Sequence, residues 1–146
     1  MPADFLVNFG TAGNYRKFKV RGWSQDEGHD DLTWISGNVA NIEFAMTPPK
    51  LAQTLTLRVM PATSGSLVQS LFIYVNGLFV GFLKAKTTAD FSFVVPAGYF
   101  SSDAQAPNLL ALVAPDAVVP AEIGAGPDQR CLSFGLVHLA IYSVAS

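Results

Sequence analysis

The chain has 146 residues, of which 50% are apolar and 14% are charged, and its formal net charge is −2. This length suits one domain, which we place at residues 1–146. The small net charge and the lack of a basic cluster argue against nucleic-acid binding, because that affinity depends on Lys and Arg neutralising phosphates. The single cysteine, Cys131, excludes a disulfide within the chain.

The amino-terminal residues do not resemble a targeting signal. Met1 and Pro2 lead directly into an apolar run without the cationic segment and long apolar core of a signal peptide. No window approaches 18 uncharged apolar residues, so we expect no membrane span. A cytoplasmic location is favoured on these grounds, although the true start of the protein stays open.

Alternation of apolar and polar residues, typical of half-buried strands, dominates the chain. In chain order the runs with this period, or with continuous β-branched and aromatic residues, are 38–44, 54–60, 71–75, 78–83, 91–95, 109–113 and 132–144. We expect about eight to ten short strands and no long helix. The fold class predicted is all-β, an antiparallel two-sheet β-sandwich of jelly-roll-like form.

Asn76 and Gly77 separate two of these runs and predict a tight hairpin, since both central residues of a type I′ turn need positive φ. After the turn, strict alternation places Phe79 on one face with Gly81 and Leu83, and Phe82 on the other. Both faces are apolar. We therefore expect one of them to meet a partner subunit.

Alternation also predicts the faces of the last strand. One face is expected to hold Leu136, His138, Ala140 and Tyr142, and the other face Val137, Leu139 and Ile141. Short turns of helix are expected near residues 96–100 or 119–123. Residues 115–127 read as one long loop, and such loops are often functional.

The segment from Trp23 to Trp34 holds both tryptophans and the densest set of polar side chains. Asp26, His29 and Asp30 lie between the tryptophans. Aromatic faces beside a few polar groups suit a sugar site, so these five residues are our candidate ligand contacts. The alternative is that both indoles close the sandwich core, with their N–H groups satisfied internally.

The acids of this segment are also a candidate calcium site, because Ca²⁺ takes six to eight oxygen ligands. Their spacing is not that of an EF-hand loop, and no other cofactor is expected. His29, His138 and Cys131 do not form a recognisable zinc or catalytic set.

A second polar cluster surrounds Arg130, which precedes a strongly apolar strand. A half-buried Arg needs a carboxylate partner, and Glu27, Glu122 and Asp128 are the candidates. We interpret these four residues as a structural cluster that fixes the long loop to the end of the sandwich. The alternative is that Arg130 and a carboxylate line a sugar site.

Several short motifs occur in a familiar order. They are Gly22-Trp23-Ser24-x-x-Glu27, Trp34-x-x-Gly37, Val75-Asn76-Gly77 with Gly81, and Pro120-x-Glu122-x-Gly124-x-x-x-Asp128-x-Arg130-x-Leu132. This order resembles β-sandwich, jelly-roll-like accessory domains of bacterial glycosyltransferases and other polysaccharide-related proteins. The resemblance implies a link to polysaccharide and places Glu27 beside Arg130 in a shared polar core.

Three functions are weighed from these features. The first is a non-catalytic, lectin-like or carbohydrate-binding-module-like domain that serves bacterial polysaccharide production or recognition. The second is a structural or oligomerisation protein, for which low charge and abundant Phe suggest a homo-oligomer or a partner protein. An enzyme comes third, since nothing in the spacing of the acids marks a glycosidase pair and no nucleophile motif occurs.

Overall fold

The computed structural model describes residues 5–24, 32–62, 68–117 and 132–143. These residues form ten strands and two short 3₁₀ helices. In chain order the elements are β1 (Phe5–Asn8), η1 (Tyr15–Lys17), β2 (Lys19–Arg21), β3 (Thr33–Ser36), β4 (Val39–Phe44), β5 (Gln53–Pro61), β6 (Gln69–Val75), β7 (Leu78–Ala85), β8 (Ala89–Val95), η2 (Ala97–Tyr99), β9 (Asn108–Val113) and β10 (Leu132–Ser143).

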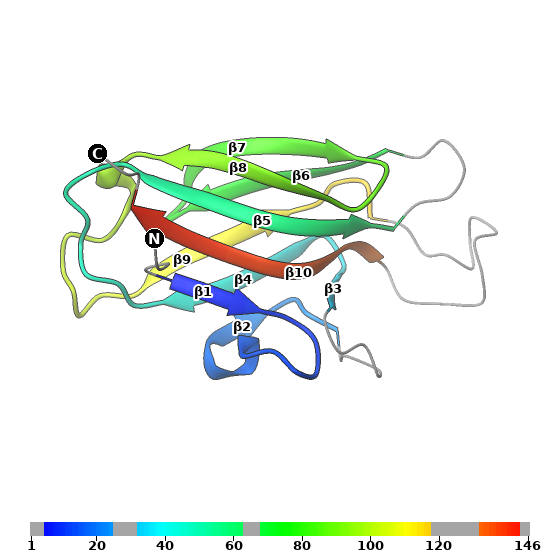
Figure 1. Ribbon diagram of the computed structural model, residues 1–146, viewed down its shortest axis with the longest axis horizontal. Coiled ribbons are helices and arrows are strands. Elements are labelled where there is room, and N and C mark those ends of the chain that lie inside the picture. The colour runs from blue at the N-terminus through cyan, green and yellow to red at the C-terminus, as the bar shows by residue number, and fades with distance from the viewer. Residues whose placement is uncertain (1–4, 25–31, 63–67, 118–131, 144–146) are drawn as a thin grey trace.

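The strands form two antiparallel sheets that face each other (Figure 1). The first sheet has the order β1-β10-β5-β8, and β3 pairs with β10 on the same edge as β1. The second sheet has the order β2-β4-β9-β6-β7 and lies behind the first in Figure 1. The predicted all-β, two-sheet antiparallel sandwich is confirmed.

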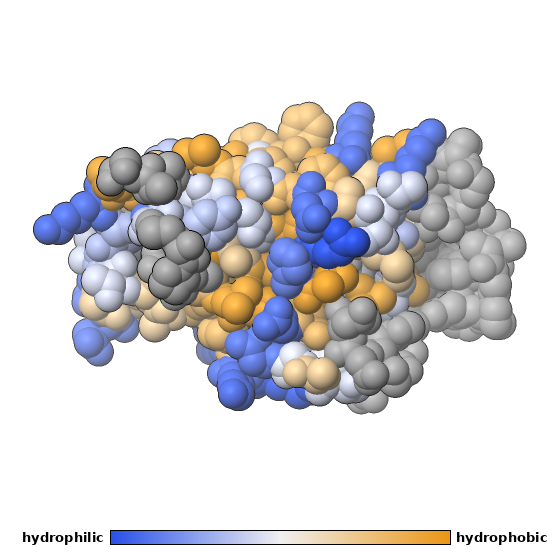
Figure 2. Space-filling model, viewed as in Figure 1, coloured by the Kyte–Doolittle hydropathy of each residue, from blue (hydrophilic) through white to orange (hydrophobic). Residues whose placement is uncertain are grey.

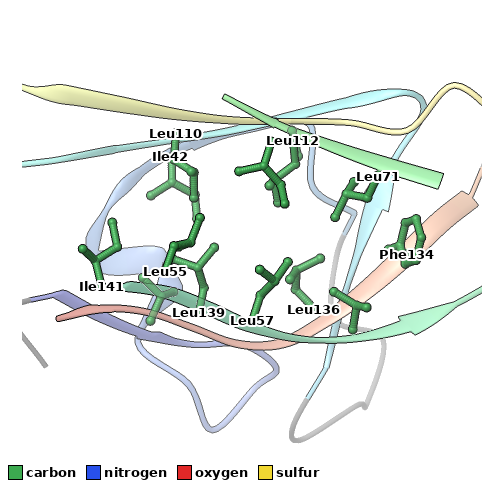
Figure 3. Close-up of a cluster of buried hydrophobic side chains, with 14 of the residues drawn as sticks. Ile42, Leu55, Leu57, Leu71, Leu110, Leu112, Phe134, Leu136, Leu139 and Ile141 are labelled. Atoms are coloured by element: carbon green, nitrogen blue, oxygen red, sulfur yellow. The ribbon is translucent and has the colours of Figure 1, made fainter. Parts of the chain in front are cut away.

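The core lies between the two sheets and is built by alternation. In β5, Leu55, Leu57 and Val59 are fully buried, while the residues between them are half-exposed, as the sequence pattern predicts. Figure 3 shows side chains of both sheets pointing toward one another across this space. Burying a side chain of this size stabilises the fold by about 1.5–3 kcal/mol. The sandwich therefore rests on apolar packing between the sheets.

Two β-bulges change the faces that simple alternation predicts. In β10, Leu136 pairs with Val59 and His138 pairs with Arg58, so Val137 is an extra residue. Leu136, Leu139 and Ile141 are consequently all buried, and the predicted grouping of Leu136 with His138 is wrong. A bulge inserts one residue and so reverses the parity of every side chain after it.

The second bulge lies in β7. Ile73 pairs with Gly81 and Tyr74 pairs with Phe79, so Val80 is the extra residue. Phe79 and Phe82 are about half-exposed, at 48% and 53%, while Leu83 is buried. The prediction that Phe79 shares a face with Leu83 is wrong, because the bulge brings Phe79 to the same outer face as Phe82.

The Asn76-Gly77 hairpin is confirmed. Both residues have positive φ, 51° for Asn76 and 80° for Gly77, as a type I′ turn requires. The Asn76 backbone N–H donates to the Leu109 carbonyl at 2.8 Å, and its side-chain oxygen accepts from the Leu109 N–H at 2.8 Å. The turn is therefore fastened to β9 as well as closing the hairpin.

At Gly22 the chain passes from one sheet to the other. Before it, Arg21 pairs with Asn41 of β4; after it, Trp23 forms a bridge with Ile35 of β3. Gly22 has φ +83°, and a Cβ there would lie 2.0 Å from the Val39 carbonyl oxygen. Only glycine fits this corner without moving the backbone.

The remaining local predictions have mixed outcomes. The helical turn predicted within 96–100 is present as η2. The alternative at 119–123 lies outside the described residues. The four elements between Phe5 and Ser36 were not predicted, since they are three or four residues long and show little periodicity. In the described part of the chain, no helix is long and apolar enough to cross a membrane.

Candidate functional site

Most of the polar residues singled out from the sequence lie outside the described part of the chain. This holds for the candidate ligand contacts Asp26, His29 and Asp30, and for the four members of the structural cluster, Glu27, Glu122, Asp128 and Arg130. Their roles, including the placement of Glu27 beside Arg130, stay predictions.

Trp23 is half-buried and contacts Phe9, which follows β1, and Asn41 of β4. Its indole ring packs against the Phe9 ring, with centroids 4.8 Å apart, and its Nε1–H donates to the Asn41 carbonyl at 3.2 Å. The indole N–H is thus satisfied internally, as the core alternative requires. These contacts give Trp23 a structural role, and a role in ligand contact stays a prediction.

Trp34 lies on the outer side of the first sheet. Thr33 and Ile35 on either side of it are fully buried, whereas Trp34 is half-buried and stands opposite Gly135 of β10. The two tryptophans therefore belong to different surroundings, and the described residues do not bring them together as one platform.

A different aromatic surface lies on the outer face of the second sheet. It consists of four side chains from the β6–β7 hairpin, Phe72, Tyr74, Phe79 and Phe82, and we call it the aromatic platform. The Phe72 and Phe82 rings are stacked with their centroids 5.6 Å apart, and the Tyr74 and Phe79 rings meet edge to face with their centroids 5.7 Å apart. The centroids of the Phe72 and Phe79 rings are 6.4 Å apart. The rings thus form one continuous, partly exposed apolar surface.

The bulge that creates this platform is held from outside the hairpin. The Tyr99 hydroxyl of η2 donates to the Phe79 carbonyl at 3.0 Å. The Asn76 side-chain amide in turn donates to the Tyr99 carbonyl at 3.0 Å and to Asn108 Oδ1 at 2.9 Å. A network across three elements therefore fixes the backbone position from which Phe79 projects.

Strand register connects the platform with a polar region. One row of directly paired residues crosses the second sheet from edge to edge, in the order Arg21, Asn41, Ala111, Tyr74, Phe79. Four strand spacings make this row roughly 19 Å long. It runs from a cation through an amide and a small side chain to two aromatic rings, and we call it the cross-sheet row.

The polar end of the row borders a pocket of about 250 Å³. Its lining comes from three neighbouring strands: Lys19, Arg21, Asn41, Glu43 and Leu109. Lys19 Nζ lies 3.3 Å from Glu43 Oε2, and both side chains are partly exposed. Arg21 forms no ion pair or hydrogen bond through its side chain among the described residues. Among the described residues, the pocket therefore holds one paired and one unpaired cation.

Sequence reasoning missed this surface for two reasons. Phe72 and Tyr74 alternate with buried neighbours in β6, and this pattern predicts that they face outward. The bulge that brings Phe79 to the same face cannot be predicted from the neighbouring sequence. Arg21 lies on a strand of only three residues, and nothing in the sequence shows that it pairs with Asn41. The pairing is decided by tertiary contacts.

The outer face of the first sheet is different. A row of paired residues crosses it too, in the order Asn8, His138, Arg58, Asp90. Arg58 Nη1 lies 3.0 Å from Asp90 Oδ2, and His138 Nε2 lies 3.8 Å from Asp90 Oδ1. Figure 2, which faces this sheet, shows polar side chains crossing its middle with apolar ones on both sides.

A second pocket, of about 410 Å³, lies in the β4–β5 connection. It is lined by Met46, Thr47, Pro48, Pro49, Lys50, Leu51, Gln53 and Ser143. Although it is the larger of the two, the described residues of its walls include no aromatic ring and a single charge, that of Lys50. It offers less for recognition of a polar ligand than the cross-sheet row. Among the described residues, no group of three or more His, Cys, Asp or Glu side chains could hold a metal ion.

No protein-family model and no curated protein matches this chain. Solved structures do. The CBM36-1 domain of a multidomain xylanase from the hindgut metagenome of Trinervitermes trinervoides is 12% identical with a TM-score of 0.56, covering 97% of this chain and 98% of that one. The carbohydrate-binding module CBM36 in complex with calcium and xylotriose is 9% identical with a TM-score of 0.54, covering 94% and 98%.

A family GH115 4-O-methyl-α-glucuronidase with specificity for decorated arabinogalactans matches at 12% identity and a TM-score of 0.64. The match covers 99% of this chain but spans only 18% of that enzyme. At these identities the likeness is one of fold. The chain has the β-sandwich fold of carbohydrate-binding modules.

Proposed function

We propose that this domain is a non-catalytic carbohydrate-binding domain that holds a glycan chain against the outer face of the second sheet. The observation that carries the proposal is the cross-sheet row, which joins exposed aromatic rings in register to Asn41 and Arg21. The fold shared with carbohydrate-binding modules supports the same class of function.

The chemistry of the row suits a sugar. Aromatic rings offer flat apolar faces for the C–H faces of pyranose rings, and binding sites combine such surfaces with a few placed polar groups. Phe79 and Phe82 are exposed enough to make this contact. The Asn41 amide can donate to and accept from hydroxyl groups, so the two ends of the row recognise different parts of one chain.

The same geometry favours binding without catalysis. Hydrolysis of a glycosidic bond ordinarily needs two carboxyl groups facing each other across the substrate. Among the described residues, Glu43 is the one carboxylate that lines the pocket, and it is paired with Lys19. The described residues of this face therefore supply a surface for holding a sugar rather than a pair of acids for cleaving one.

The test is a titration of the domain with soluble neutral polysaccharides by calorimetry, repeated with the double variant Phe79→Ala, Phe82→Ala. Truncating central aromatic contacts costs at least about 2 kcal/mol, so we expect an affinity loss of more than tenfold. The matched control is Leu6→Ala, Val94→Ala, which removes exposed apolar side chains from the first sheet. Equal affinity in wild type and the platform variant would disprove the proposal.

A second candidate function is self-association through β7. This strand lies at the edge of the second sheet and exposes Leu78, Phe79 and Phe82, and an exposed apolar edge strand is a template for pairing. Light scattering at increasing concentration separates the two functions. A dimer that the platform variant dissociates, without any glycan binding by wild type, would favour self-association.

The link to bacterial polysaccharide production and the calcium site are finer parts of the proposal. The prediction of a calcium site rests on Asp26, Asp30 and their neighbours in sequence. One similar structure is a complex with calcium and xylotriose. Repeating the titration after chelation with EDTA tests whether binding needs a metal. The identity of the neighbouring genes tests the link to polysaccharide.

A further inference from the structure

Arg21 is the feature of this face that binding of a neutral sugar does not explain. It lies at the end of the cross-sheet row, on the edge strand β2, and its side chain is exposed. Its guanidinium has no side-chain partner among the described residues. A guanidinium carries five N–H donors in a planar fork, which matches two oxygens of one carboxylate.

The surroundings of Arg21 leave a net positive charge in the pocket. Lys19 is 3.3 Å from Glu43, so this pair is locally neutral, and Arg21 is the surplus cation. By contrast, Arg58 on the first sheet lies 3.0 Å from Asp90 and is paired. The chain as a whole has a net charge of −2, so attraction of an anion to this place has to be local.

We infer that the glycan held by this domain carries carboxylates, as uronic acid units do, and that Arg21 binds one of them in bidentate fashion. This inference rests on the proposed function and adds the class of sugar. A sugar stacked on Tyr74 and Phe79 extends along the row over the small Ala111 toward Asn41 and Arg21. The Asn41 amide is then placed to bond a hydroxyl of the acidic unit.

The single surplus positive charge in the pocket favours a glycan with carboxylates over one with closely spaced sulfate groups. The described residues of the pocket offer one unpaired cation, which balances the single charge of one carboxylate. Lys19 and Glu43 neutralise each other and add no net charge. A polymer with sulfate groups on most units would therefore bring several negative charges to a site that balances one.

The experiment uses a matched pair of polymers. One is a soluble polysaccharide that bears uronic acids, and the other is the same polymer after its carboxylates are reduced to alcohols. A charge-assisted bidentate contact corresponds to an affinity difference of about tenfold or more. We expect wild type to bind the acidic form at least about tenfold more tightly, and this preference to shrink as salt is raised.

Two variants locate the effect at Arg21. Arg21→Gln should lose the preference while keeping the affinity for the reduced polymer, and Arg21→Lys should keep only part of it because the fork is gone. The control Lys86→Gln removes one exposed cation from the β7–β8 turn and should leave the preference unchanged. Dextran sulfate serves as a densely charged polymer without carboxylates.

The outcomes separate this inference from the function on which it rests. Equal affinity of wild type for the two forms, or an unchanged preference in Arg21→Gln, overturns the uronic acid inference and leaves carbohydrate binding intact. Tighter binding of dextran sulfate than of the uronic acid polymer also overturns it. Failure to bind either form overturns both.

Discussion

The two outer faces of the sandwich carry the same kind of cross-strand row but use it differently. On the first sheet the row from Asn8 to Asp90 contains its own counter-charges, since Arg58 and Asp90 are 3.0 Å apart. On the second sheet the row from Arg21 to Phe79 ends on one side in a cation that has no partner among the described residues, and on the other in exposed rings.

This difference shows how a face becomes available for a ligand. Polar groups that satisfy one another gain little from a new partner, because binding first has to break their existing contacts. The exposed aromatic rings and the Arg21 guanidinium, which has no partner among the described residues, have no such polar contacts to lose. The second sheet is therefore the face on which a ligand gains most.

The largest expected effect comes from blocking the middle of the cross-sheet row. Ala111→Phe places a ring between Asn41 and Tyr74, so a sugar can no longer lie along the row. We expect glycan affinity to fall more than about tenfold, as for the loss of a central contact, with little change in the unfolding temperature because Phe suits a half-exposed strand position.

Calorimetric titration and thermal unfolding together check this prediction. Thr56→Phe makes a similar enlargement on the outer side of β5 in the first sheet and should leave binding unchanged. If both variants lost affinity equally, the two faces would not differ in function.

A smaller effect is expected from removing one hydrogen bond that holds the aromatic platform in place. Tyr99→Phe removes the hydroxyl that donates to the Phe79 carbonyl at 3.0 Å. Loss of such a hydrogen bond lowers the free energy of unfolding by about 0.5–1.5 kcal/mol, and we expect a modest fall in glycan affinity because Phe79 is held less firmly.

Chemical denaturation and the same titration measure the two quantities. Tyr142→Phe is the matched control, since Tyr142 lies on the outer face of β10 and its hydroxyl bonds to none of the described residues. An unchanged affinity in Tyr99→Phe would mean that the bulge in β7 keeps its shape without this contact.

The smallest effect is expected on the first sheet. Arg58→Gln breaks the ion pair with Asp90, but both side chains are well exposed, at 41% and 65%. Exposed pairs contribute about 0.2–1 kcal/mol, so stability should hardly change and glycan affinity should not change at all. The same chemical change at Arg21 is expected to remove the preference for acidic sugar. A loss of affinity in Arg58→Gln would move the candidate site to the first sheet.

Local patterns in the sequence predict the fold class and part of the core. The alternation in β4 and β5 placed Ile42, Leu55 and Leu57 inside, and all three are buried. Asn76 and Gly77 predicted the hairpin, because few residue pairs adopt positive φ at both positions. These features are local, since each depends on neighbours in the chain.

The candidate site was decided by tertiary structure. The extra residue Val80 brings Phe79 to the face of Phe82, and a bulge depends on how two strands pair, which no window of the sequence displays. The same holds for Arg21, which reaches the platform only through the pairings of β2, β4, β9, β6 and β7. Register across a sheet joins residues distant in sequence, so the row of cation, amide and aromatic rings exists only in the folded chain.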